Sequence, residues 1–166
     1  MTSLMPTELT ARAAEVLAVL EGLELKAATA ESCTGGLVAA ALTAIAGSSS
    51  VMERGFVTYS NEAKTEMLGV PPEIIIAHGA VSEPVARAMA EGALSHSHAQ
   101  VAVAITGIAG PGSDGTDKPV GLVHFARAAT GMPTSHHVEV FAGDRDAVRL
   151  AAAMTALGML LPPPPI

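Results

Sequence analysis

One continuous apolar run constrains the fold of this chain more than any other feature. Residues 99–110, AQVAVAITGIAG, have the length of a strand and carry no charge. Such a run is typical of a central strand whose sheet is covered on both faces. The sequence therefore predicts a layered protein, with other elements packed above and below this strand.

The rest of the chain alternates between strand-like and helical segments. Further strands are predicted over residues 25–32, 54–60, 120–128 and 135–141. Helices are predicted over residues 6–23, 35–45, 61–69, 72–79, 81–94 and 143–161. Helical connections favour parallel early strands, whereas the last two strands should form an antiparallel pair at one side of the sheet. We expect a single domain over 1–166, an α/β/α three-layer sandwich with a mixed, mostly parallel sheet and a proline-rich tail at 162–166.

Residues that cap helices mark several of these boundaries. Thr7, Ser82 and Asp144 stand at expected N-caps, and Ser60 or Asn61 should cap the helix over 61–69. A glycine follows or closes several of the helices, as is common at helix C-termini.

Composition excludes several classes of function. The net charge is −7, with 9 Lys and Arg residues in all, so we expect no nucleic-acid surface. Residues 32–52 carry no charge, but their glycines, serines and alanines argue against membrane insertion, and no membrane partner is expected. The chain has one cysteine and its N-terminus resembles no signal peptide. We therefore expect a soluble, cytoplasmic protein.

The stretch TAESCTGG at 29–36 places Ser32 between a predicted strand and a predicted helix. The N–H groups of Cys33, Thr34 and Gly35 would then lie at a helix N-terminus, where they could bind a phosphate or the oxyanion of a tetrahedral intermediate. The alternative is that Ser32 or Thr34 only caps the helix. The local pattern by itself favours the cap.

A second strand-to-helix turn, TYSNEAK, carries Thr58, Tyr59, Asn61 and Lys64. A lysine in the first helical turn opposes the helix dipole, which suggests a role other than stability. Burial could lower its pKa enough for it to act as the base of a serine nucleophile. The two turns together favour a Ser32–Lys64 pair over a simple cap.

Two other patterns carry less information. GPGSDG at 110–115 satisfies G-x-G-x-x-G but opens no helix, so it is no dinucleotide fingerprint; it is either a binding loop or a plain connector. The six histidines lack metal-ligand spacing, and no metal is expected.

Five blocks of this sequence resemble the CinA C-terminal family. They are TAESCTGG, RGFVTYSNEAKTEMLGV, HGAVSEPVARAMAEGAL, ITGIAGPGSDGTDKPVGLVHFA and FAGDRDAVR, in the family's order, and the resemblance extends over about residues 7–160. The enzymatic members are nicotinamide-nucleotide amidohydrolases, so the resemblance implies hydrolysis of nicotinamide mononucleotide to nicotinate mononucleotide and ammonia, in pyridine-nucleotide recycling. Larger relatives carry a further N-terminal domain, whose activity we do not expect here.

The resemblance also implies roles for single residues. Ser32 would be the nucleophile, Lys64 the base and Tyr59 a proton relay, with no cofactor. Thr106 and Gly107 would line the pocket, and Arg145 would bind the phosphate or hold the last helix. The full set of expected substrate-binding residues is Cys33, Thr34, Gly35, Gly36, Thr58, Asn61, Thr106, Gly107 and Arg145.

Two rival hypotheses remain at this point. Cys33 could be the nucleophile, although a small buried core cysteine is the simpler expectation. The chain could also be a non-catalytic nucleotide-binding or protein-interaction module linked to competence or DNA damage. The apolar composition further suggests a homodimer or a higher homo-oligomer.

Overall fold

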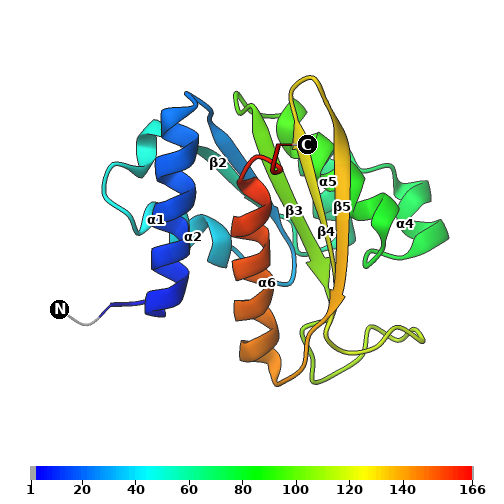
Figure 1. Cartoon of the computed structure of the whole chain (residues 1–166). Coiled ribbons are helices and arrows are strands. Elements are labelled where there is room, and N and C mark those ends of the chain that lie inside the picture. The colour runs from blue at the N-terminus through cyan, green and yellow to red at the C-terminus, as the bar shows by residue number, and fades with distance from the viewer. Residues whose placement is uncertain (1–2, 166) are drawn as a thin grey trace.

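The computed structural model describes residues 3–165, and these have an α/β fold built on one sheet (Figure 1). The strands are β1 (Ala27–Glu31), β2 (Met52–Val57), β3 (Val101–Gly107), β4 (Leu122–Ala129) and β5 (Met132–Val140). The helices are α1 (Thr7–Gly22), α2 (Leu37–Thr43), α3 (Asn61–Leu68), α4 (Pro72–His78), α5 (Glu83–Ser95) and α6 (Arg145–Leu160), with a short 3₁₀ turn at Ser48–Ser50. Residues 1–2 and residue 166 at the end of the expected tail lie outside the described part of the chain.

The five strands form one sheet in the order β2-β1-β3-β4-β5. β1 pairs in parallel with β2 and β3, whereas β3–β4 and β4–β5 pair antiparallel, which makes two pairs of each kind. The mixed sheet and the antiparallel C-terminal hairpin are confirmed. The apolar run at 99–110 contains the central strand β3, which has β1 on one side and β4 on the other.

Helices cover both faces of this sheet and make the three layers (Figure 1). The residues of β3 alternate between the two cores, because successive side chains of a strand point to opposite faces. Val103 and Ile105 pack with α1, α2 and α6, while Ala102 and Ala104 pack with α5. The alanine face allows α5 to lie close to the sheet.

The predicted caps are partly right. Ser60 and Asp144 accept hydrogen bonds from the N–H groups of Ala63 and Ala147, so both are N-caps with a bonded side chain. Thr7 is not an N-cap: α1 begins at Thr7 and Pro6 precedes it, because proline's fixed φ suits the entry to a helix. Ser82 is the N-cap of α5 by position, but its hydroxyl donates to the carbonyl of Gly79.

The second strand differs from the prediction at both ends. It runs over Met52–Val57, so Thr58, Tyr59 and Ser60 form a turn after the strand.

Among residues 3–165, no helix combines the length and apolar character that a membrane span needs. Pro162–Pro165 follow α6 as an exposed irregular tail.

Candidate active site

The two polar turns lie side by side because they follow neighbouring parallel strands. Glu31 at the end of β1 is in register with Val57 at the end of β2. The N–H of Thr58 donates to the carbonyl of Glu31 at 2.9 Å, and the N–H of Ser32 donates to Ile105 of β3 at 3.0 Å. The carboxyl ends of three parallel strands thus fix where Ser32 lies, at the edge where open α/β sheets bind ligands.

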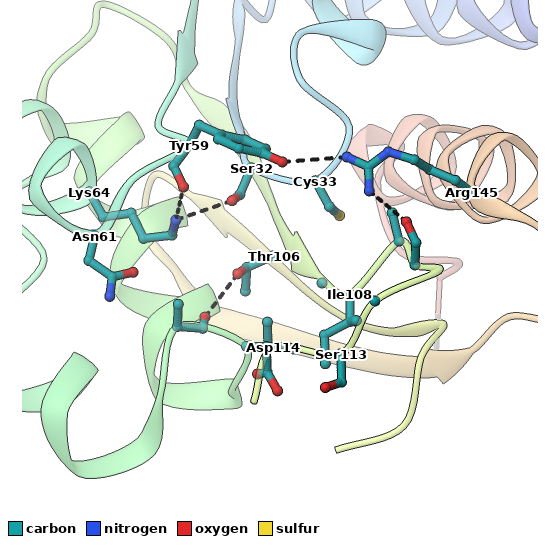
Figure 2. Close-up of a pocket in the computed structure, with 16 residues that line it drawn as sticks. Ser32, Cys33, Tyr59, Asn61, Lys64, Thr106, Ile108, Ser113, Asp114 and Arg145 are labelled. Atoms are coloured by element: carbon teal, nitrogen blue, oxygen red, sulfur yellow. Dashed lines mark hydrogen bonds between the residues drawn. The ribbon is translucent and has the colours of Figure 1, made fainter. Parts of the chain in front are cut away.

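Lys64 and Ser32 meet in a buried hydrogen bond at this edge (Figure 2). The Nζ of Lys64 lies 3.1 Å from the Oγ of Ser32, and it donates to the carbonyl of Thr58 at 2.9 Å and to that of Tyr59 at 3.4 Å. Lys64 is 1% exposed and Ser32 is 8% exposed. The sequence places the amine in the first turn of α3, and the preceding turn wraps two carbonyls around it.

The surroundings of Lys64 favour its neutral form. Burial lowers the pKa of its ammonium below the ordinary 10.5, because the charged form loses its water shell. Within residues 3–165 its ammonium forms no ion pair, and its three partners are two carbonyls and a hydroxyl. An uncompensated buried cation is costly, so the proton is held weakly.

The side chain of Glu31 binds several groups of the turn that carries Ser32 and of the helix that follows it. Its carboxylate, which is completely buried, accepts from Thr34 Oγ1 at 2.7 Å, Val38 N at 2.9 Å and Ala39 N at 3.0 Å. Helix α2 begins only at Leu37, so this carboxylate caps it across the turn. The alternative that the side chain of Ser32 or Thr34 caps the helix is wrong, since Glu31 binds its first N–H groups. Glu31 and Thr34 take up the first N–H groups of α2, so these groups are not available to a phosphate.

Of the N–H groups in the turn after Ser32, one is bound within the turn and two are free. The N–H of Gly35 donates to the carbonyl of Ser32 at 3.0 Å. It is therefore not free to bind a ligand, contrary to our expectation. Cys33 and Thr34 donate no backbone hydrogen bond to any acceptor within residues 3–165. Gly35 and Gly36 have φ of +60° and +99°, which only glycine adopts without strain and which the turn needs.

A cavity of about 240 Å³ opens beside Ser32 and Lys64 (Figure 2). Eight of the residues expected at the site line it: Ser32, Cys33, Tyr59, Asn61, Lys64, Thr106, Gly107 and Arg145. Four expected residues do not. Thr34 and Thr58 are buried: the hydroxyl of Thr34 donates to Glu31, and the carbonyl of Thr58 accepts from Lys64. Gly35 and Gly36 give the turn its shape through their positive φ angles.

The role of Tyr59 needs a correction. Its side chain is 65% exposed and its hydroxyl lies 3.4 Å from the guanidinium of Arg145, whereas only its carbonyl contacts Lys64. The expected relay from Tyr59 to Lys64 therefore has no hydrogen bond in this structure. Arg145 also donates to the carbonyl of Gly110 at 2.7 Å, so it joins Tyr59 to the loop after β3.

That loop lines the cavity, which favours the binding-loop interpretation of GPGSDG over a plain connector. Gly110, Gly112, Ser113 and Asp114 line the cavity, as do Ala80 and Val81 from the segment before α5. Lys118 ties the two segments together by donating to the carbonyls of His78 and Val81. Sequence reasoning missed Ala80 and Val81, because neither side chain carries a chemical signal.

Cys33 is a buried side chain, as expected. It packs in the core beneath α1, α2 and α6, and burial raises the pKa of its thiol to about 11. A thiol with so high a pKa is a poor source of thiolate at neutral pH. Among residues 3–165, no group of three or more His, Cys, Asp and Glu side chains is arranged to hold a metal ion.

Residues 9–162 match the sequence model of the CinA C-terminal domain. The chain belongs to this family. It is 57% identical over 132 residues to the nicotinamide-nucleotide amidohydrolase PncC of Escherichia coli K12, and the match covers 80% of each chain. It is also 57% identical over 140 residues to a putative competence-damage inducible protein of Symbiobacterium thermophilum, of which it covers 33%.

Solved structures of the family share the fold. The competence/damage inducible protein CihA from Agrobacterium tumefaciens has a TM-score of 0.92 and 51% identity, with 96% of this chain and 97% of that one covered. A CinA superfamily protein from Escherichia coli has a TM-score of 0.86 and 38% identity over 96% of this chain and 92% of that one. The chain spans about a third of the longer curated relatives it matches, 33% of each.

Proposed function

We propose that this member of the CinA C-terminal domain family hydrolyses the carboxamide of nicotinamide mononucleotide, giving nicotinate mononucleotide and ammonia in pyridine-nucleotide recycling. The name of the E. coli relative supports the substrate, since that protein covers 80% of this chain at 57% identity. The observation that carries the chemistry is the buried Lys64 amine 3.1 Å from the Ser32 hydroxyl.

The hydrogen bonds around Lys64 suit a neutral amine. A neutral amine has two N–H groups and one lone pair. Its N–H groups would donate to the carbonyls of Thr58 and Tyr59, and its lone pair would accept the proton of the Ser32 hydroxyl. The two carbonyls thereby orient the lone pair toward the nucleophile, which is the geometry of general-base activation.

In the first half-reaction, Ser32 Oγ attacks the carboxamide carbon while its proton passes to Lys64. The C–O bond forms and the carbonyl oxygen becomes an oxyanion, for which the free N–H of Cys33, a residue that lines the cavity, is the donor. Protonated Lys64 then gives its proton to the amide nitrogen, the C–N bond breaks, and ammonia leaves. Lys64 can make this transfer without Tyr59, whose hydroxyl is bonded to Arg145.

In the second half-reaction, water replaces ammonia at the same position. Lys64 takes a proton from the water, the new C–O bond forms, and the ester bond to Ser32 breaks with return of the proton to Oγ. The product leaves the second half as a carboxylic acid, and it becomes a carboxylate by releasing its proton to water or to the departed ammonia. Lys64 carries the proton transfers at the reacting atoms in both halves.

Arg145 is our candidate for the substrate phosphate. It lines the cavity at the opposite side from Lys64 (Figure 2), and its guanidinium can bind a phosphate through two N–H groups. Asn61 and Asp114 are available for the ribose hydroxyls. A crystal structure with bound nicotinate mononucleotide tests this assignment, and a phosphate bound away from Arg145 would reject it.

Ammonia release from nicotinamide mononucleotide by the purified chain tests the function. We expect Ser32→Ala to lose at least about a thousandfold in rate, as nucleophile removal does, and Cys33→Ala to keep most of it. Loss of activity in Cys33→Ala with an active Ser32→Ala would reject the assignment of the nucleophile. Calorimetric binding of the mononucleotide without ammonia release would instead favour the non-catalytic module.

A further inference from the structure

Arg127 on β4 differs from the other arginines of this chain in having no polar partner. Within residues 3–165 its guanidinium forms no hydrogen bond and no ion pair, although the residue is only 8% exposed and its Nε is fully buried. Every other arginine bonds an acceptor in the same range. These are Arg12, Arg54 and Arg87, which pair with glutamates, Arg145, which donates to Gly110, and Arg149, which donates to the carbonyls of Cys33 and Thr34.

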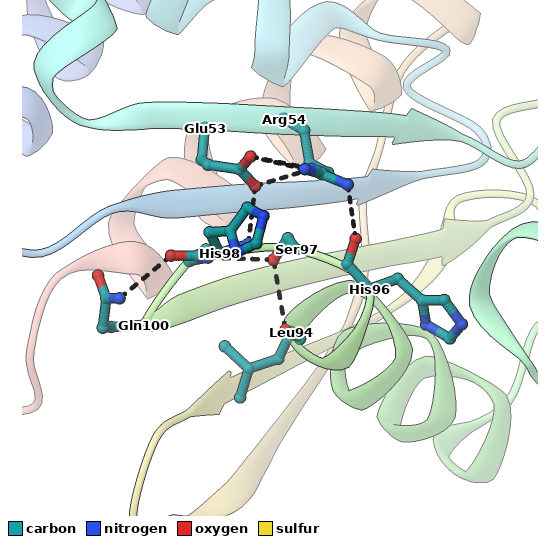
Figure 3. Close-up of polar contacts among 8 residues, drawn as sticks. Glu53, Arg54, Leu94, His96, Ser97, His98 and Gln100 are labelled. Atoms are coloured by element: carbon teal, nitrogen blue, oxygen red, sulfur yellow. Dashed lines mark hydrogen bonds and ion pairs between the residues drawn. The ribbon is translucent and has the colours of Figure 1, made fainter.

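Arg54 shows how an arginine is satisfied elsewhere in this protein (Figure 3). It is exposed, yet it pairs with Glu53 at 2.8 Å and donates to the carbonyl of His96 at 2.9 Å. Arg127 loses more of its water than Arg54 does and gains no partner in return. Burial lowers the pKa of the Arg127 guanidinium, but an arginine stays protonated at neutral pH. The buried charge therefore lacks the counter-charge that such a group needs.

The C-terminal end of α6 does not replace a counter-ion. This helix ends at Leu160, and the negative end of a helix dipole attracts a cation. That attraction corresponds to about half a charge spread over several carbonyls. Within residues 3–165, none of these carbonyls accepts a hydrogen bond from Arg127. A full negative charge at this place would compensate the guanidinium better.

Arg127 lines a cavity of about 290 Å³ between the β4–β5 hairpin and the end of α6. Ser135, its neighbour across the hairpin, lies on the same side of the sheet and adds a hydroxyl. None of the described residues that line the cavity is acidic. The other walls are apolar or small residues: Met132, Pro133, Gly158, Met159, Leu161 and the prolines at 162–164.

This cavity is separate from the active-site cavity. Arg145 at the start of α6 lines the active-site cavity, whereas Gly158 near the end of α6 lines this one. A rise of about 1.5 Å per residue places the two positions about 20 Å apart along the helix. Figure 1 shows that the end of α6 lies toward the β4–β5 turn, and its start toward the loop that follows β3.

We propose that this second cavity binds a small organic carboxylate, whose oxygens bond Arg127 and whose apolar part contacts the methionines. A carboxylate matches the planar fork of a guanidinium through two parallel hydrogen bonds, and its single charge neutralises the cation. A phosphate carries nearly two charges at neutral pH, which one guanidinium and one hydroxyl do not balance. The apolar walls favour a ligand with an apolar body.

The probe is benzoate, and benzyl alcohol is its neutral analogue. The full chain is labelled with carbon-13 at its methionine methyl groups, and NMR follows the signals of Met132 and Met159, assigned through Met132→Leu and Met159→Leu. We expect benzoate to shift both signals, and benzyl alcohol to bind at least about tenfold more weakly. Arg127→Met should raise the Kd of benzoate about 10–100-fold, which is what one charge-assisted pair contributes.

Two further variants complete the test. Arg54→Met is the matched control, because it removes an exposed guanidinium, and its Kd for benzoate should stay within about twofold of wild type. Arg127→Lys keeps the charge but not the fork, so its affinity should lie between those of wild type and Arg127→Met. It takes the place of Arg127→Met should that variant fail to fold.

Three results would overturn the proposal. The first is a wild-type chain whose Met132 and Met159 signals do not respond to benzoate, since the end of α6 would then suffice for Arg127. The second is equal affinity for benzoate in wild type and both Arg127 variants. The third is tighter binding of inorganic phosphate than of benzoate at the same signals, which would reject the carboxylate class. These signals report on the second cavity alone, so none of the results depends on the proposed amidase function.

Discussion

The buried carboxylate of Glu31 offers the sharpest test of how the nucleophile turn is held. Glu31→Gln keeps the length of the side chain and one oxygen. That oxygen can still accept from Thr34 and Val38, but an NH₂ group then faces the N–H of Ala39, which Oε2 accepts at 3.0 Å in the wild type. The change leaves two donors facing each other in a fully buried site.

The cost follows from two contributions. An unsatisfied buried donor costs about 1–3 kcal/mol. Loss of the negative charge at the N-terminus of α2 adds up to about 2 kcal/mol in a buried geometry. We expect Glu31→Gln to lower the free energy of unfolding by about 2–4 kcal/mol, and Tm by about 5–15 °C for a chain of this size.

Urea denaturation of wild type, Glu31→Gln and Asp144→Asn measures this directly. Asp144 also caps a helix with its carboxylate, accepting from Ala147 N at 2.9 Å, but it is exposed. Asparagine caps about as well as aspartate, so Asp144→Asn should cost less than about 1 kcal/mol. Equal stability of the two variants would refute this explanation, because only Glu31→Gln leaves a buried donor without an acceptor.

Two further predictions concern the base and the packing of α5. Because the pKa of Lys64 lies below 10.5 and its neutral form is the base, kcat/KM for ammonia release should rise with pH through one ionisation below 10.5; a fall over that range would contradict the role of Lys64. The unfolded chain binds the extra proton between the two pKa values, so this group makes stability rise with pH there. Gly92→Ala should destabilise the protein by about 3 kcal/mol in urea denaturation, since the new Cβ would lie 2.0 Å from the carbonyl oxygen of Leu68. Gly22→Ala, with open space at Cβ, should be neutral or stabilising; equal effects of the two changes would reject this packing argument.

The sequence predicted the features that depend on nearby residues. The caps at Ser60 and Asp144 were predictable because each side chain bonds an N–H three residues on. The mixed sheet was predictable from the alternation of segments and the apolar run of β3. The proximity of Ser32 and Lys64 followed once their turns were assigned to neighbouring parallel strands.

Contacts between distant segments were not predictable in the same way. The direction of the Tyr59 side chain depends on Arg145, 86 residues away. The two carbonyls of the nucleophile turn are bound by Arg149, 115 and 116 residues away. Glu31 stands next to Ser32 in sequence, but its role as a cap became visible only when α2 was found to begin at Leu37 rather than at the predicted Gly35.

Both helices that follow the site turns begin with caps from the chain itself, and this has a consequence for the chemistry. Glu31 caps α2 and Ser60 caps α3, so the N–H groups of Val38, Ala39 and Ala63 are bound internally. A substrate phosphate therefore has little to gain at the N-terminus of α2, and Arg145 offers a guanidinium in the cavity. The free N–H groups belong to the turn before α2, immediately after Ser32. Donors placed there meet the charge that develops on the carbonyl oxygen during the attack, rather than charge the substrate already carries. This arrangement favours catalysis over tight binding of the ground state, because it strengthens only when the oxyanion forms.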